Sequence, residues 1–228
     1  MKTTIHDTKR VEICFITLQH ILLSKIISIL IMNKNRLETF SDGVFAIVIT
    51  LLVLNISLPD TDINHLANGL LLLLPKLFSY LISFVLIGLY WVGHHFYFDK
   101  IKKINGTFLW LNLLLLLSIS ILPFPTSLLG KFPFQPLTLT IYGCNLLATN
   151  LISFLMLRYI YCNRQLANEH FKDEFYKTQL PVFISVNAIY VVAIACSFFY
   201  PVISYVLFIS VLVITLKMYI KRMNEFSK

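Results

Sequence analysis

The chain has 228 residues, of which 57% are hydrophobic and only 13% are charged. A soluble domain carries about 25% charged residues, so this composition excludes a water-soluble protein. It predicts an all-α polytopic membrane protein that lies in a lipid bilayer. The formal net charge of +8 does not indicate a nucleic-acid partner, because the basic residues stand in short stretches between apolar runs.

Residues 1–32 precede the first continuous apolar segment and form an N-terminal extension. The run 11–32 is apolar, but Glu12 and Lys25 interrupt it. Two interpretations stay open for this extension. It is either an amphipathic helix in the membrane interface, or a consequence of a start placed too early, since Met32 opens a self-sufficient beginning.

Six apolar segments follow, and we expect each to form a membrane-spanning helix; the first, with nineteen residues, gives about 28 Å, enough for the hydrocarbon core. The two prolines at 123 and 125 are expected to end the third segment, because proline cannot continue a helical hydrogen-bond ladder. We expect residues 33–222 to form one six-helix domain and residues 223–228 a short tail. The predicted segments are 40–58, 70–97, 108–122, 137–161, 181–200 and 201–220.

The positive charges predict the orientation of these segments. With the amino terminus inside, seventeen of the nineteen Lys and Arg residues fall on the inner side, and only Lys76 and Lys131 lie outside. Lys and Arg accumulate on the cytoplasmic side of membrane proteins. We therefore expect a multi-pass protein of the cell membrane, a bacterial plasma membrane, with both termini cytoplasmic.

Polar residues stand at the start of the first segment, where Ser41 and Asp42 follow Phe40. Two interpretations stay open. The residues initiate the helix, with Ser41 as a cap and Asp42 at the positive end of the helix dipole. Alternatively, they meet other buried polar residues inside the bundle, where each buried group needs a hydrogen-bond partner. The available partners are His94, His95 and Asn112.

Other kinds of site find little support in the sequence. Arg36 can reach Asp42 as a counter-ion only if the helix begins between them. His94 and His95 point about 100° apart on a helix, so both cannot easily bind one metal ion. No Ser, Cys or carboxylate pair stands at catalytic spacing from a base. We therefore expect neither an enzyme, nor a metal site, nor a cofactor.

Three motifs occur in order along the chain: RLETFSDGVFAI at 36–47, WVGHH at 91–95 and LPFPT at 122–126. Together they resemble the transmembrane protein 175 family of potassium channels, especially its bacterial six-helix members. The resemblance implies a homotetramer that conducts potassium ions and lacks the TVGYG filter loop. It also implies that the first helix of each subunit lines the pore.

The resemblance further assigns roles to residues of this chain. Ile47 falls at the family's pore constriction and Thr50 at a hydroxyl layer that selects the ion, with Leu51 and Leu54 continuing the lining. Spacings of three, four and seven residues place these four side chains on one helical stripe. A second set is expected to support the first helix against its neighbours. It comprises Arg36, Phe40, Ser41, Asp42, Trp91, His94, His95 and Asn112.

The expected function is therefore leak-type potassium conduction, since no segment carries the arginine repeat of a voltage sensor. Two other functions stay open. One is a secondary transporter or proton-conducting membrane protein, although the chain has no inverted repeat and no broken-helix pair. The other is a non-conducting scaffold.

Overall fold

A computed structural model of the chain describes residues 33–54, 56–57, 66–169, 171 and 173–226. Within these residues the regular elements are helices, apart from one isolated bridge between Ile101 and Ala167. This confirms the predicted all-α fold, while the extension 1–32 lies outside the described residues. The helices are α2 (Lys34–Val53), α3 (Leu66–Leu72), α4 (Leu74–Asp99), α5 (Gly106–Ile121), α6 (Pro123–Lys131), α7 (Pro136–Cys162), α8 (Asp173–Ser197) and α9 (Pro201–Phe226).

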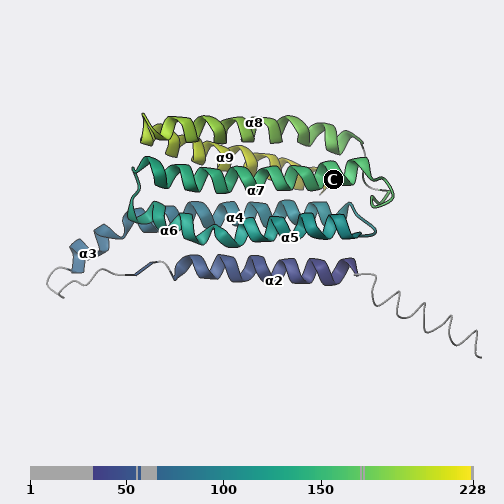
Figure 1. Cartoon of the computed structure of the whole chain (residues 1–228), viewed down its shortest axis with the longest axis horizontal. Helices are drawn as coiled ribbons and strands as arrows, with labels where there is room; N and C mark the ends of the chain where they lie inside the picture. Colours follow the sequence, from purple (N-terminus) through teal and green to yellow (C-terminus); the bar gives the residue numbers. More distant parts are fainter. Residues whose placement is uncertain (1–32, 55, 58–65, 170, 172, 227–228) are drawn as a thin grey trace, which may run out of the picture.

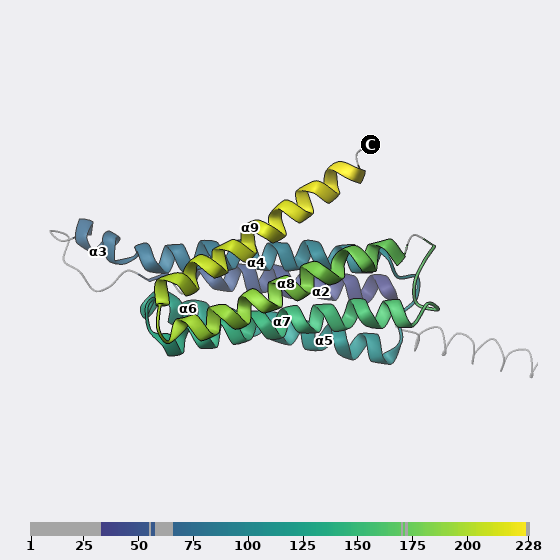
Figure 2. The same cartoon turned by 90° about the horizontal axis from the view of Figure 1, so that it is seen from above.

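The long helices lie side by side in an elongated bundle (Figure 1). Helix α2 forms one edge and packs against α4, α5 and α6. Helix α7 follows, and α8 and α9 form the opposite edge. Seen from above, the carboxyl-terminal half of α9 diverges from the other helices (Figure 2). In the described part of the chain, one broad side of α2 is therefore left without a neighbour.

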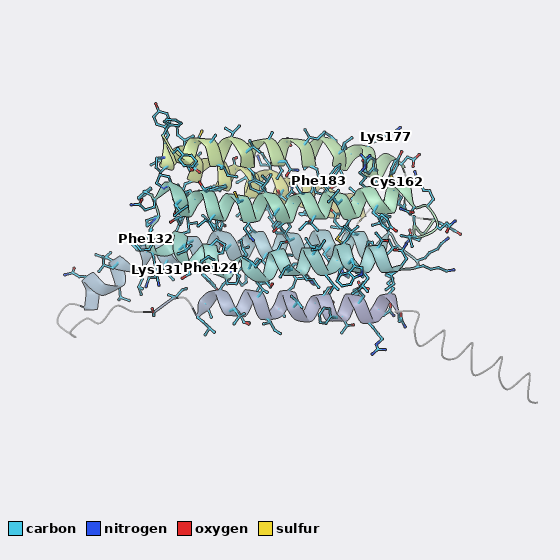
Figure 3. All side chains as sticks on the ribbon, in the orientation of Figure 1. Phe124, Lys131, Phe132, Cys162, Lys177 and Phe183 are labelled. Atoms are coloured by element: carbon cyan, nitrogen blue, oxygen red, sulfur yellow. The ribbon has the colours of Figure 1, made fainter. Side chains whose placement is uncertain are left out.

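Successive long helices run in alternating directions through the bundle. The start of α2, the α4–α5 loop, the α7–α8 loop and the end of α9 lie at the same end of the molecule (Figure 1). Cys162 and Lys177 lie at this end, and Lys131 lies near the other (Figure 3). The basic loops that the charge pattern grouped together are therefore gathered in space.

Five stretches of the described chain are long and apolar enough to cross a membrane. They are 67–99, 106–131, 136–162, 175–197 and 201–220. Helix α2 precedes them and corresponds to the first predicted segment. It differs from the five because its first half carries the charged residues Lys34, Arg36, Glu38 and Asp42.

Two predicted helix starts were too late. Helix α2 begins at Lys34, not at residue 40, because the side chain of Asn33 caps it by accepting a hydrogen bond from the Asn35 amide at 3.1 Å. Helix α8 begins at Asp173, not at residue 181, and Pro181 lies inside it. Both helices extend beyond the apolar run into polar sequence, where hydropathy does not report helix boundaries.

The prolines after the third segment do not end the helical path. Helix α5 ends at Ile121 and α6 starts at Pro123, so the two form one apolar stretch. Proline fits the first helical turn, where its missing amide proton is not needed. Gly130 then lets α6 approach α4 closely, since a Cβ there would stand 3.0 Å from the Cα of Lys76.

Two loops at the basic end are joined to each other. The amide of Lys102 donates to the carbonyl of Leu166 at 2.8 Å, and the amide of Asn168 donates to the carbonyl of Lys100 at 2.9 Å. Arg164 also forms an ion pair with Asp173 at the start of α8. The α4–α5 and α7–α8 connections therefore form one hydrogen-bonded unit.

The core runs through the bundle and includes buried side chains of α2 and of α4 to α9. Its largest fully buried side chains include Tyr142, Tyr190 and Phe208. Tyr142 and Phe208 meet edge to face with ring centroids 5.4 Å apart. Gly143 makes this packing possible, since a Cβ there would stand 2.7 Å from Ile194 and 3.1 Å from Phe208.

Replacing Gly143 by Val should destabilise the subunit by about 1–3 kcal/mol, the usual range for an overpacked core. The thermal midpoint of the purified protein in detergent measures this loss. Gly88→Ala is the matched control, because a Cβ at Gly88 meets nothing within 4 Å and alanine favours the helix. Equal midpoints for the two variants would contradict the close α7–α8–α9 contact.

Candidate functional site

The two sides of α2 have different surroundings. Its buried side, which faces α4, α5 and α6, includes Ser41, Phe45, Val48 and Leu52. The opposite side is exposed along its whole length. The sequence motif at 36–47 therefore contributes to two surfaces. One packs against the neighbouring helices through polar and apolar side chains, and the other is open.

The open face carries the four residues predicted to line a pore. Ile47 is 60% exposed and Leu54 is 74% exposed, and Leu51 and Thr50 lie beside them. The hydroxyl of Thr50 donates to the carbonyl of Ile47 at 2.8 Å. Its oxygen therefore stays available as an acceptor on this face. We call these four residues the α2 stripe.

A chain of hydrogen bonds holds the buried side of α2. Asn112 on α5 is its centre: its Oδ1 lies 2.7 Å from His94 Nε2, and its Nδ2 donates to Ser41 Oγ at 3.0 Å. Ser41 in turn donates to the carbonyl of Leu37 at 2.8 Å. His94, Asn112 and Ser41 are all buried, so each side chain satisfies the next away from water.

The directions of these bonds identify the histidine tautomer. Because Asn112 presents its amide nitrogen to Ser41, its carbonyl oxygen faces His94 and can only accept. The imidazole therefore carries a proton on Nε2. In the neutral ring, Nδ1 is then the acceptor.

A second pair of contacts joins α2 to α4 nearer the surface. Trp91 Nε1 donates to Asp42 Oδ1 at 2.9 Å. One turn later on α4, His95 Nδ1 lies 3.4 Å from Glu38 Oε1. The helices run antiparallel, so the pair four residues apart on α4 meets the pair four residues apart on α2.

The structure separates two members of the predicted supporting set from the rest. Arg36 is exposed and forms no ion pair with Asp42 within the described residues. The helix begins before Arg36, and a separation of six residues leaves the two side chains about 120° apart around the helix axis. Phe40 is also exposed and lies on the open face with Ile47, seven residues away.

The interpretation of Ser41 and Asp42 as residues that initiate the helix is wrong. Both lie well inside α2, and Ser41 bonds back to the carbonyl four residues earlier instead of capping amides. His94 and His95 turn toward different partners, Asn112 and Glu38. Across the described part of the chain, no three His, Cys, Asp or Glu side chains gather as metal ligands would.

Sequence reasoning missed Glu38 as the partner of His95. The signal was present, because Glu38 and Asp42 are spaced four residues apart, as are Trp91 and His95. It becomes visible only when the helix start is placed before Glu38. Phe98, whose ring centroid lies 4.4 Å from that of His94, was also missed.

Comparisons with known proteins agree on one family. The family model described as endosomal/lysosomal potassium channel TMEM175 matches residues 36–123. A potassium channel of Chryseobacterium is 36% identical over 173 residues, which cover 76% of this chain and 87% of that protein. The mouse endosomal/lysosomal proton channel TMEM175 is 37% identical over 114 residues, covering 46% of this chain and 23% of the mouse protein.

A solved structure shares the arrangement of the helices. It is the crystal structure of a lysosomal potassium-selective channel TMEM175 homolog from Chamaesiphon minutus, with a TM-score of 0.73 and 29% identity. The match covers 81% of this chain and 97% of that chain. The match therefore extends over most of both chains.

Replacing Asn112 by Ala should destabilise the subunit by about 1–2 kcal/mol, because His94 and Ser41 then lose their shared partner inside the membrane. The shift in thermal midpoint in detergent measures this. Ser118→Ala on the same helix is the control, since its hydroxyl bonds to the nearby carbonyl of Leu115 on its own helix. If both variants melt alike, the chain of hydrogen bonds does not hold α2.

Proposed function

The chain belongs to the transmembrane protein 175 family, and we propose that it is a subunit of a potassium-selective, leak-type channel whose path runs along the α2 stripe. The observation that carries this proposal is the division of α2 into a hydrogen-bonded back and an open front. The names of its relatives in Chryseobacterium and Chamaesiphon minutus, both potassium channels, support the choice of ion.

The proposed assembly is a homotetramer with four α2 helices around a central axis. Closed cyclic symmetry brings the same surface of every subunit to that axis. The stripe would then be covered by its three copies instead of by lipid. The back of each α2 stays attached to its own subunit through Asn112 and Trp91.

The chemistry of the stripe suits a selective neck. A ring of four Ile47 side chains makes a narrow apolar constriction that tends to exclude water. A cation must shed part of its hydration shell to pass, and potassium does so at lower cost than sodium. Four Thr50 oxygens, available as acceptors on the open face, would replace part of that shell, as oxygen dipoles do in other potassium pores.

Ile47→Asn should reduce discrimination between potassium and sodium, because four polar amide side chains around the axis would let water into the constriction. Reversal potentials under a potassium–sodium gradient in planar bilayers measure the change. The matched control is Ile184→Asn on α8, because Ile184 and Ile47 are both 60% exposed in the subunit. Equal reversal potentials for the two variants would remove Ile47 from the path.

The same recordings test proton conduction, which the names of the vertebrate relatives raise. A potassium channel gives reversal potentials that follow the potassium gradient. A proton channel gives potentials that follow the pH gradient at constant potassium. A transporter gives slow coupled flux, and a scaffold gives none, so either result would contradict the proposal.

Asp42→Ala should reduce the tetrameric fraction, because α2 then loses its hydrogen bond to Trp91, one of the contacts that attach it to its own subunit. Size-exclusion chromatography with light scattering in mild detergent measures the assembly. Asp42→Asn is the conservative control, since the amide oxygen still accepts from the indole. An intact tetramer in Asp42→Ala would contradict the supporting role of this contact.

We further propose that the basic end of the bundle is cytoplasmic, as the accumulation of Lys and Arg there favours. Single cysteines in a cysteine-free background test this orientation. Lys103→Cys should react with an impermeant maleimide only after the cells are opened, whereas Lys131→Cys should react in intact cells. The reverse pattern would invert the orientation.

A further inference from the structure

A cavity of about 50 Å³ lies inside the subunit, and the residues that line it belong to α4 and to later helices. Helices α4, α5, α7, α8 and α9 all contribute to its walls. Polar groups line it among apolar side chains, including Ser153 of α7, Tyr190 of α8 and Thr215 of α9. This cavity takes no part in the proposed conduction path, so its contents can be determined whether or not the protein conducts ions.

Two side chains in its wall carry unsatisfied donors. Asn150 is 7% exposed and Gln179 is 3% exposed. Within the described residues, neither Asn150 Nδ2 nor Gln179 Nε2 has a hydrogen-bond partner. An unpaired buried amide is costly, and more so where lipid replaces water around the helices. Two such amides beside one cavity indicate that the cavity supplies the missing acceptors.

We propose that this cavity is a binding site for a small cluster of water molecules that accept hydrogen bonds from Asn150 and Gln179. Its size selects this occupant. An engineered apolar cavity that binds benzene measures about 150 Å³, whereas one water needs about 10–15 Å³. The space therefore suits roughly three or four waters, and the hydroxyls of Ser153, Tyr190 and Thr215 provide further partners.

The water cluster would contact His94, the residue at one end of the hydrogen-bond chain that holds α2. His94 lines the same cavity, and its Nε2 is already engaged by Asn112. Nδ1 of His94 is therefore free to accept a hydrogen bond, and a cavity water would donate it. The hydrogen-bond chain from Leu37 through Ser41, Asn112 and His94 would thus end on internal water, not on an apolar wall.

Tyr219 of α9 lines the cavity next to Gly93 of α4. A Cβ at Gly93 would stand 2.3 Å from the Tyr219 hydroxyl, so this approach requires a glycine. The Tyr219 ring stacks on Phe96 with centroids 5.8 Å apart. The carboxyl-terminal half of α9 diverges from the other helices (Figure 2).

A structure of the full chain in lipid nanodiscs, at about 2 Å resolution where ordered waters are visible, tests the proposal. We expect separate water peaks within hydrogen-bonding distance of both amides. An empty cavity, or one continuous elongated density, would overturn the proposal. Xenon pressure gives an independent measurement, because xenon enters dry apolar cavities, and xenon bound here would also overturn it.

The double variant Asn150→Leu, Gln179→Leu should lose the water peaks. It should also lose magnetisation transfer from water to the ¹⁵N-labelled imidazole of His94. Asn187→Leu on α8 is the matched control, since its Oδ1 also lacks a partner but the residue does not line the cavity. Unchanged transfer in the double variant would contradict the proposal, and the wild-type structure decides the question if that variant does not fold.

Discussion

The structure depends on the requirement that polar groups inside a lipid-embedded bundle satisfy one another. His94, Asn112 and Ser41 come from three different helices and meet this requirement as one chain of hydrogen bonds. Ser41 must face α5 for the chain to close, and this sets the rotation of α2 about its own axis. The apolar stripe is open because Ser41 is held on the other side.

Sequence patterns predicted the helix limits well where the apolar run and the helix end at the same residues. Helix α7 differs by one residue at each end from its prediction, because Pro136 and the polar sequence after Cys162 mark both limits. The patterns failed where a helix continues into charged sequence, as α2 and α8 do. They also failed at Pro123, since a proline stops one helix and starts the next equally well.

The candidate site was only partly accessible to sequence reasoning. The motifs included Asp42 and Trp91, and Asn112 was expected as a buried polar partner; the structure places all three in hydrogen-bonded contact with residues of neighbouring helices. Which residue meets which was not predictable, since pairing depends on the direction and rotation of two helices. Arg36 was misplaced and Glu38 overlooked for one reason, the late start assigned to α2. The cavity beyond His94 has no sequence signal, because its walls come from five separate helices.

The hydrogen-bonded loops at the basic end have a mechanical consequence. Lys100 and Lys102 on one connection are fastened to Asn168 and Leu166 on the other, so a tilt of α4 must be passed on to α7 and α8. A rearrangement that widens or narrows the assembly at this end would therefore move the α4–α5 and α7–α8 helix pairs together as one rigid body. The hydrogen-bonded loops would keep their shape during that movement.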